Sequence, residues 1–531
     1  MKQGIRMTTY SIIYRILAGA VLYYLCPMRL RWMVLMLYSF ALYALGGGQA
    51  ICFILLTTLS TYLAARLLDA MNACVKSKIA ENKSLSREEK KQIKAQAGKC
   101  RRTVLVLTLL VNFGMLGVLK YVPDLPGMML DGAFSLIGKS APAVRLFVPL
   151  GISFFIFQSA GYLIDVYNGK YPAEKNLLHY TLFVSFFPQL IQGPIGRYDA
   201  LAPQLITPHR LDVGNIRNGL ILMMWGFFKK KVIADTAFPL VEAVFSNHEP
   251  YGGAVIVCAV LMYSLQQYAD FSGGIDLVTG GAELMGIHLA PNFKRPYFSV
   301  SLGDFWRRWH ISLGGWMRDY VFYPFALTKP VQKLTKAAKK TLGTDMARAL
   351  PAALGNILVF TLVGLWHGAT GHYIAWGLYN GLILAFSALM EPAYKRFGEK
   401  NEKLVSGRLF YVFRILRTFV IVNIGWYFDR ALRVSDAFAM LRKTITKPCF
   451  AQMTDGTLLS LGVSAGGFGV LAGALVMLFF VSIMQERGIR MRTWLMERPI
   501  VIRWTMLYLL VFYSMMFFVP NAVTGFLYAA F

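Results

Sequence analysis

The chain has 531 residues, of which 55 are Lys or Arg and 27 are Asp or Glu, so its formal net charge is +28. Hydrophobic residues make up 56% of it and charged residues only 15%, against about 25% in an average soluble domain. This composition excludes an ordinary soluble protein and predicts an all-α, polytopic membrane protein with a single integral domain over residues 1–531. A nucleic-acid partner is also excluded, because the cations stand between apolar segments instead of lining a water-facing groove.

Apolar segments recur from one end of the chain to the other. About eleven or twelve of them are long enough to be membrane-spanning helices in contact with the lipid bilayer. The segments 175–195 and 272–326 are apolar and aromatic but broken by Pro, Gly and paired charges, which is typical of re-entrant or interfacial helices. The predicted spans are 9–27, 30–46, 50–70, 103–120, 145–166, 217–240, 253–271, 352–368, 372–391, 409–428, 461–484 and 501–519.

The densest run of positive charge extends over residues 76–102, where ten basic residues face three glutamates. Lys and Arg beside membrane spans stay on the cytoplasmic side, so we expect a cytoplasmic loop here and a multi-pass protein of the bacterial cytoplasmic membrane. Alternation from this loop puts the basic stretches 229–231 and 329–348 on the same side. The basic segment 430–447 does not fit this topology, because the same alternation places it on the extracytoplasmic side.

The cysteines and the known nucleotide and metal motifs give no positive signal. Six cysteines are scattered without a C-x-x-C pair, and the chain has no H-E-x-x-H, Walker-type or Asp-rich cation loop. We therefore expect no disulfide framework, no metal and no nucleoside triphosphate.

Two of the seven histidines stand in unusual surroundings, and the first is His367. It follows Trp366 and precedes Gly368 at the end of an apolar span, where an ionisable ring is costly unless it has a partner or a water-filled cavity. A neutral imidazole with a pKa near 6.5 can take a proton from an attacking hydroxyl. His372 lies at the same membrane end in more polar company, which favours an interfacial, structural role for it.

The second is His310, in a segment where aromatic and basic residues alternate from Asp304 to Tyr320. Composition alone favours a helix in the headgroup region, with its Trp residues in the interface and its Arg residues on phosphates. Against this, Asp304 and Asp319 add carboxylates to the same segment, and such polar density in an apolar protein often lines a cavity. Asp165, Asp270 and Asp276 are further acids at membrane depth.

Several ordered motifs together resemble the membrane-bound O-acyltransferase family, and within it the bacterial branch that acts on alginate and teichoic acid. The resemblance covers about residues 145–390, which we take as the core of the domain, and is closer to the alginate type. The motifs are Pro149–Phe154, Phe186–Leu190 with Gly193 and Pro194, Tyr268–Gly273, Asn292–Tyr297, Phe305–Ser312 and Trp366–Gly368.

The resemblance implies a ring of tilted helices around a thin centre, which donor and acceptor approach from opposite membrane faces. It also implies that His367 is the catalytic histidine and His310 a second histidine needed for activity. His310 would position the donor or stabilise developing charge. Substrate contacts are expected from the neighbouring residues Trp306, Arg307, Arg308, Asp304, Asp270, Asp276, Trp366 and Asn292.

The activity expected from this resemblance is transfer of an acyl group, expected to be acetyl, to a hydroxyl. The donor would be a cytoplasmic thioester, either acetyl-CoA or an acyl-carrier protein, used as a co-substrate with no bound cofactor. The acceptor would be an extracytoplasmic polysaccharide or a partner protein of esterase fold that completes transfer. Two alternatives stay open: D-alanyl transfer from a carrier protein to teichoic acid, and a transporter or flippase of a glycan precursor in which the histidines relay protons.

Overall fold

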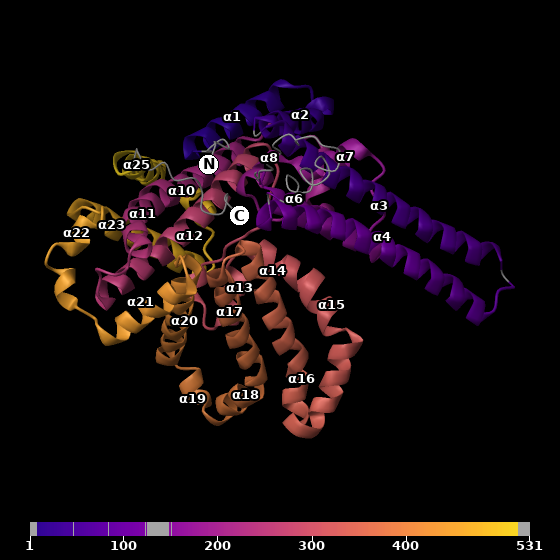
Figure 1. Cartoon of the computed structure of the whole chain (residues 1–531). Helices are drawn as coiled ribbons and strands as arrows, with labels where there is room; N and C mark the ends of the chain where they lie inside the picture. Colours follow the sequence, from indigo (N-terminus) through magenta and orange to yellow (C-terminus); the bar gives the residue numbers. More distant parts are fainter. Residues whose placement is uncertain are drawn as a thin grey trace, which may run out of the picture. The chain divides into compact units, whose positions relative to one another are not determined.

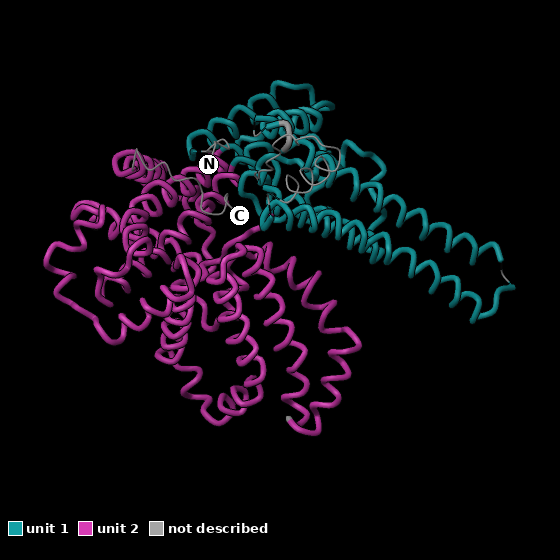
Figure 2. The backbone as a smooth tube through the Cα atoms, in the orientation of Figure 1, with its two compact units in different colours: residues 1–216, 281–289, 530 teal, residues 217–280, 290–529, 531 magenta. Residues whose placement is uncertain are grey.

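The structure is a computed structural model that describes residues 8–45, 47–82, 84–122, 124, 148–149 and 151–518 (Figure 1). Within these ranges all regular structure is helical, so the predicted all-α class is confirmed. The described residues divide into two compact units (Figure 2). Unit 1 holds the chain up to residue 216 and residues 281–289, and unit 2 holds residues 217–280 and 290–518. A single integral domain over the whole chain remains a prediction.

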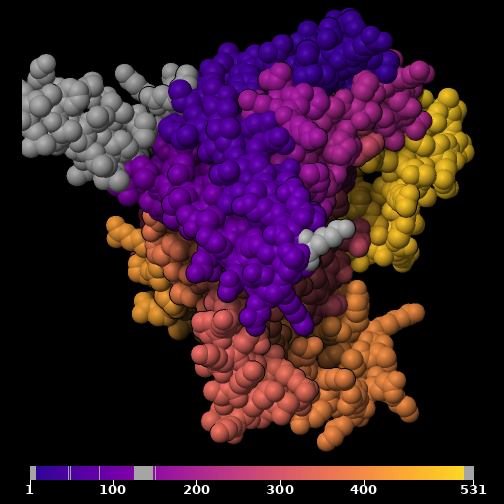
Figure 3. Space-filling model, turned by 90° about the vertical axis from the view of Figure 1, so that its right-hand side faces the viewer, coloured from indigo at the N-terminus to yellow at the C-terminus, as the bar shows by residue number. Residues whose placement is uncertain are grey.

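Unit 1 is built around a long helical hairpin of α3 and α4, which Figure 3 shows from the side of its tip. The helices packed with the hairpin include α2, α6 and α7. The bounds of the unit are α1 (Thr9–Leu25), η1 (Met28–Leu30), α2 (Arg31–Ala44), α3 (Gly48–Glu81), α4 (Arg87–Tyr121), α6 (Ile152–Tyr167), α7 (Leu177–Ser185), α8 (Phe187–Gln192) and α9 (Tyr198–Ile206), followed by the start of α10 (Val213–Phe227).

The basic stretch 76–102 was expected to be a loop, and that expectation is wrong. It forms the end of α3 and the first half of α4, with only a short turn between them. Its Lys, Arg, Glu, Gln and Ala residues are strong helix formers, so the helices continue beyond their apolar portions. Ser86 and Glu89 start α4 with a capping box, in which each side chain accepts a hydrogen bond from the other residue's backbone N–H.

Unit 2 begins with the rest of α10, a π-helical segment η2 (Phe228–Ala234) and α11 (Asp235–Ser246). Helix α12 (Gly253–Leu284) follows and ends in unit 1. The centre of the unit is formed by η3 (Pro296–Phe298), α13 (Leu302–Arg308), α14 (Ile311–Met317), η4 (Arg318–Phe322), α15 (Tyr323–Ala326), α16 (Lys329–His367) and α17 (Gly371–Leu389). The remaining elements are α18 (Glu391–Lys400), α19 (Glu402–Val405), α20 (Arg408–Arg430), α21 (Val434–Thr446), η5 (Phe450–Met453), α22 (Thr457–Ser460), α23 (Ala465–Glu486), α24 (Met491–Met496) and α25 (Ile500–Met516).

Six described helices are long and apolar enough to cross a bilayer, and a seventh span arises if α17 and α18, bent by 54°, are counted together. The six are Ala50–Glu81, Arg87–Tyr121, Gly253–Leu284, Gly343–His367, Arg408–Arg430 and Ala465–Glu486. A polytopic membrane protein is thus confirmed, with fewer full spans than predicted. Several expected spans are helices of 14 to 17 residues, which at 1.5 Å per residue fall short of a hydrocarbon core of about 30 Å. Part of the predicted span 145–166 lies outside the described residues.

Two further boundaries differ from the sequence prediction. The segment 272–326 was expected to be broken by Pro, Gly and paired charges. In the structure α12 runs unbroken to Leu284, and the breaks begin only after it. The expected loop 329–348 is helical and belongs to α16, which has a non-helical break at Gly343. By contrast, the segment 175–195 is broken as predicted, between α7 and α8 at Phe186.

Helices α16, α17 and α20 run side by side in unit 2 (Figure 1). The α16–α17 contact is close because glycines face backbone across it. A Cβ atom at Gly364 would stand 2.5 Å from the carbonyl oxygen of Tyr373, and one at Gly377 would collide with that of Phe360. Small residues of this kind let membrane helices approach closely. This close contact at Gly364 and Gly377, here called the glycine seam, fixes the end of α16, three residues after Gly364.

We expect Gly377→Ala to destabilise the protein by about 1–3 kcal/mol, because the added methyl group overpacks the seam. Gly114→Ala is the matched control, since Gly114 also lies in an apolar helix but has no heavy atom within 4 Å of the place that a Cβ atom would occupy. The control should leave stability unchanged or raise it slightly through helix propensity. Unfolding of both variants in detergent measures the difference, and equal stabilities would contradict the close seam.

Candidate functional site

A cavity of about 480 Å³ lies in unit 2 between α13, α14, η4, α16 and α17. Its wall contains both singled-out histidines, His310 and His367, although they are far apart in sequence. Trp306, Arg307 and Trp376 also line it. The volume falls in the range of about 300–1,000 Å³ that is usual for small-molecule sites.

His310 is held in place by a short stretch of paired backbone. The Lys294 N–H donates to the Arg308 carbonyl at 2.9 Å, and the Ile311 N–H donates to the Asn292 carbonyl at 3.0 Å. These bonds clamp the segment before η3 against the junction of α13 and α14. His310 occupies that junction with φ 45°, a left-handed conformation that a non-glycine residue adopts only when its surroundings impose it.

The side chain of Asn292 determines which nitrogen of His310 carries the proton. Its Oδ1 accepts hydrogen bonds from the Ser312 N–H at 3.0 Å and the Ser312 hydroxyl at 2.9 Å, so this atom is the amide oxygen. The same oxygen lies 3.2 Å from His310 Nδ1. In the neutral ring Nδ1 is therefore the donor, and Nε2 keeps the lone pair.

His310 lies outside the six apolar helices and is buried. Burial lowers the pKa of its imidazole to about 3, because desolvation disfavours the charged form. Near neutral pH the ring is uncharged, and its Nε2 is a hydrogen-bond acceptor.

His367 is the last residue of α16, and aromatic rings surround it. The Trp366 ring centroid lies 5.1 Å from that of His367 and 6.3 Å from that of His310, so one indole contacts both imidazoles. Trp376 of α17 packs on His367 at 4.8 Å. On its other side, His367 Nδ1 lies 3.8 Å from Asp429 Oδ1, and both side chains are buried.

His372 lies two helical positions into α17 and has a different environment. Its Nε2 pairs with the Thr370 hydroxyl at 2.8 Å and its Nδ1 with the Phe428 carbonyl at 3.1 Å. Both ring nitrogens are thus used within the fold, and His372 is not part of the cavity wall. This agrees with the structural role expected for it.

The indole of Trp306 forms part of the cavity wall and is fixed by a polar residue of α17. Its Nε1 donates to Asn380 Oδ1 at 3.1 Å, and the Asn380 amide donates to the Trp376 carbonyl at 2.9 Å. Ring contacts of Trp306 with Trp376 at 5.6 Å and Phe360 at 5.0 Å complete the aromatic wall.

The two arginines before His310 have different environments. Arg307 lines the cavity with its side chain 72% exposed. Asp304 pairs with both arginines, at 3.5 Å from Arg307 and 3.2 Å from Arg308, and Arg308 also pairs with Glu486 at 2.7 Å. Glu486, at the end of α23, also binds Arg295 at 2.5 Å. Arg308 thus fastens α13 to α23, while Asp304 forms its ion pairs within α13, and neither lines the cavity.

Asp270 and Asp276 lie away from the cavity, in ion pairs with the lysines of η2. Lys230 pairs with Asp270, and Lys229 with Asp276 at 2.8 Å. Lys231 pairs with Asp235 at 2.5 Å. The stretch 229–231, inside the predicted span 217–240, was expected to lie on the cytoplasmic side. Its three lysines are buried in helical structure beside carboxylates.

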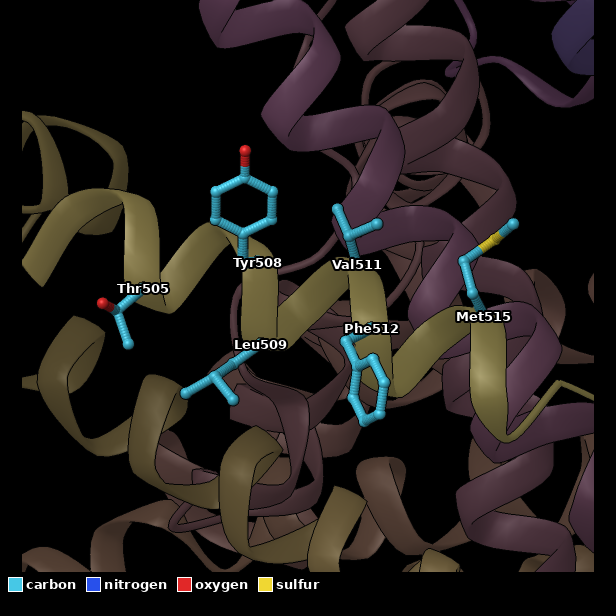
Figure 4. A pocket seen from close by; sticks show the side chains of 6 residues that line it. All are labelled: Thr505, Tyr508, Leu509, Val511, Phe512 and Met515. Atoms are coloured by element: carbon cyan, nitrogen blue, oxygen red, sulfur yellow. The ribbon is translucent and has the colours of Figure 1, made fainter. Parts of the chain in front are cut away.

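A second hollow, of about 590 Å³, lies on one face of α25 (Figure 4). Its lining is mostly apolar, and the polar groups are the hydroxyls of Thr505 and Tyr508. It has no acid, base or cation for group transfer, so the cavity with the two histidines is the candidate site.

Sequence reasoning missed three polar residues that support the site: Asn380, Asp429 and Glu486. Asp429 satisfied the criterion of an acid at membrane depth, but the predicted span ended at residue 428. Asn380 stood inside an apolar segment as its one amide, which was a usable signal. Glu486 had no signal in the sequence, because its role depends on arginines from another part of the chain.

Comparison with known proteins identifies the family that the chain resembles. Residues 172–424 match the model of the membrane-bound O-acyltransferase family. The chain is 35% identical to a probable alginate O-acetylase AlgI of Pseudomonas syringae, over 62% of the chain and 57% of the relative. It is 32% identical to a peptidoglycan O-acetyltransferase of Helicobacter pylori, over 65% of each. A teichoic acid D-alanyltransferase of Bacillus subtilis is 29% identical, over 54% of the chain and 69% of the relative.

Residues 172–424 thus form a membrane-bound O-acyltransferase domain, as the motifs predicted. The core bounds 145–390 stay a prediction. With six apolar helices, the chain is a multi-pass protein of the bacterial cytoplasmic membrane. The chain spans less than two thirds of the length of the alginate and peptidoglycan relatives described.

We expect Asp270→Asn to lower the free energy of unfolding by about 3 kcal/mol, because the buried Lys230 would then depend on the Asp235 carboxylate, which already pairs with Lys231. Asp276→Asn should cost less, because the Asp276 side chain is 22% exposed and that of Asp270 only 1%. Denaturant unfolding in detergent measures both. A stability equal to wild type for Asp270→Asn would argue against a structural role and return this residue to the list of substrate contacts.

Proposed function

We propose that the protein is an O-acyltransferase that moves an acyl group, expected to be acetyl, from a thioester donor to a hydroxyl group. The observation that carries this proposal is the single cavity with His310 and His367 in its wall. The acetyl-transferring relatives support acetyl as the group, and alginate and peptidoglycan, named in their titles, support an extracytoplasmic glycan as the acceptor.

In this proposal His367 is the general base. The acceptor oxygen attacks the thioester carbonyl carbon while His367 Nε2 takes the hydroxyl proton. The carbon–sulfur bond then breaks, and the proton on Nε2 passes to the leaving sulfur, so the base is regenerated. The described residues that line the cavity include no Ser, Thr or Cys, which supports direct attack instead of an acyl-enzyme.

The hydrogen bond between His310 and Asn292 limits the role that His310 can have in the reaction. Because its proton is on Nδ1 and directed to Asn292, its Nε2 accepts a hydrogen bond and cannot donate one to an oxyanion. Of the two expected roles, positioning is therefore favoured over stabilisation of negative charge. A thioester donor with an amide-bearing arm offers N–H groups to such an acceptor.

The donor is expected to carry negative charge, as coenzyme A and acyl-carrier proteins do. Arg307 and Arg318 line the cavity with largely exposed side chains, 72% and 61%, and are suited to meet such a donor. Arg308, expected among the substrate contacts, is paired with Asp304 and Glu486 and does not line the cavity. D-alanyl transfer from a carrier protein remains the second candidate, supported by the similarity to the D-alanyltransferase.

His367→Gln should reduce turnover by roughly 10²- to 10⁴-fold, because glutamine cannot act as a base near neutral pH. His372→Gln is the matched control: it changes the same residue type, similarly buried and five residues away, outside the cavity. Acyl transfer by purified protein, normalised to folded molecules, measures both. If His367→Gln keeps more than about a tenth of wild-type turnover, His367 is not the general base.

Arg307→Gln should raise the KM for the donor several-fold while kcat changes little, and rising salt should weaken donor binding by the wild type more than by this variant. Arg348→Gln is the control. Arg348 is equally exposed, at 72%, and like Arg307 it lies beside an aspartate three residues away. A donor KM that rises equally in both variants would indicate a general charge effect and remove Arg307 from the donor site.

A further inference from the structure

Asp429 is a buried carboxylate near the end of α20 whose two oxygens have different neighbours. Oδ2 accepts a hydrogen bond from the Tyr263 hydroxyl at 2.6 Å and another from the Gln267 amide at 3.2 Å. Oδ1 faces His367, with Nδ1 at 3.8 Å. Tyr263 and Gln267 belong to α12, so this carboxylate connects α12 and α20 to the last residue of α16.

We propose that Asp429 is the positioning residue of His367, in a step that rests on the proposed function. Its Oδ1 would accept the Nδ1–H of the imidazole and so direct the Nε2 lone pair into the cavity. The present separation exceeds hydrogen-bond length by less than about 1 Å, which a small movement on substrate binding closes. Asp429 lies beyond residue 424, where the match to the family model ends.

The two bonds at Oδ2 explain why Oδ1 is available. Tyr263 and Gln267 fix the carboxylate from one side, and among the described residues no group donates a hydrogen bond to Oδ1. The neighbouring cation Arg430 pairs with Glu242 at 2.5 Å. One oxygen of Asp429 is thus anchored by α12, and the other is directed to the proposed base.

The role of Asp429 follows the proton through the reaction. When His367 Nε2 takes the proton of the acceptor hydroxyl, both ring nitrogens carry hydrogen and the ring becomes a cation. The Asp429 carboxylate stabilises that cation without being protonated itself. Both side chains are only 3% exposed, so solvent and salt screen this attraction little. The proton on Nε2 then leaves with the sulfur of the donor.

The test compares the full-length protein in detergent with Asp429→Asn and Asp429→Glu. Asp429→Asn should reduce kcat by about 10²-fold or more, with the KM values for donor and acceptor changed less than about threefold. Asp429→Glu keeps the charge and should recover part of the loss. Glu242→Gln is the control, because it removes a carboxylate from the adjacent ion pair and should leave kcat unchanged.

A double variant separates positioning from a structural effect. If Asp429 acts through His367, Asp429→Asn should cost little in a His367→Gln background, because the base is already absent. Losses that multiply in the double variant would overturn the inference. So would an Asp429→Asn protein that keeps more than about a third of wild-type kcat while His367→Gln is inactive. An active His367→Gln protein would instead show that His367 is not the general base, whereas a wild-type protein without acyl transfer would overturn the proposed function.

If Asp429→Asn does not fold, Tyr263→Phe provides the measurement. It keeps the carboxylate but removes one of the two bonds that orient it. We expect kcat to fall about tenfold, with KM values unchanged. An unchanged kcat in a folded Tyr263→Phe protein would overturn the inference.

Discussion

A polar group buried inside this protein has little access to water, so its hydrogen-bond or ion-pair partner must come from the protein itself. That constraint decides where the chain's buried charges and amides lie. The lysines of η2 are matched by carboxylates, and Arg308 is matched by Asp304 and Glu486. Asn292 uses one oxygen to fix both His310 and the start of α14. The cavity is a place where polar groups line open space, and this marks it as a site.

Much of the fold and site followed from the sequence because its main signals are local. Apolar length predicts helices and a membrane, and a histidine beside Trp366 at the end of a span is costly enough to indicate function. The ordered motifs predicted the acyltransferase domain. They also implied a functional role for both His310 and His367. Composition alone did not favour such a role for His310, yet both histidines lie in the wall of the cavity.

The remaining features depend on partners that are distant along the chain, so local patterns could not predict them. Asp270 looked like a pocket residue because it lies at membrane depth, yet its carboxylate forms an ion pair with Lys230. Lys76 to Arg102 looked like a loop because charge commonly marks loops, yet helix propensity is also high there. Arg308 and Asp304 stood beside His310 in sequence, but they pair with each other, and Arg308 also pairs with Glu486, which lies far along the chain.

The break at Gly343 divides α16 into two helical halves with separate axes. Gly343 has φ 75° and ψ 168°, so the helical hydrogen-bond ladder is interrupted between the basic half and the apolar half that ends at His367. The basic half therefore does not continue the axis of the apolar half, and the glycine seam with α17 fixes the position of His367 at the end of the apolar half. Substitutions in the basic half are therefore expected to change acyl transfer little. Substitutions in the apolar half are expected to change it more.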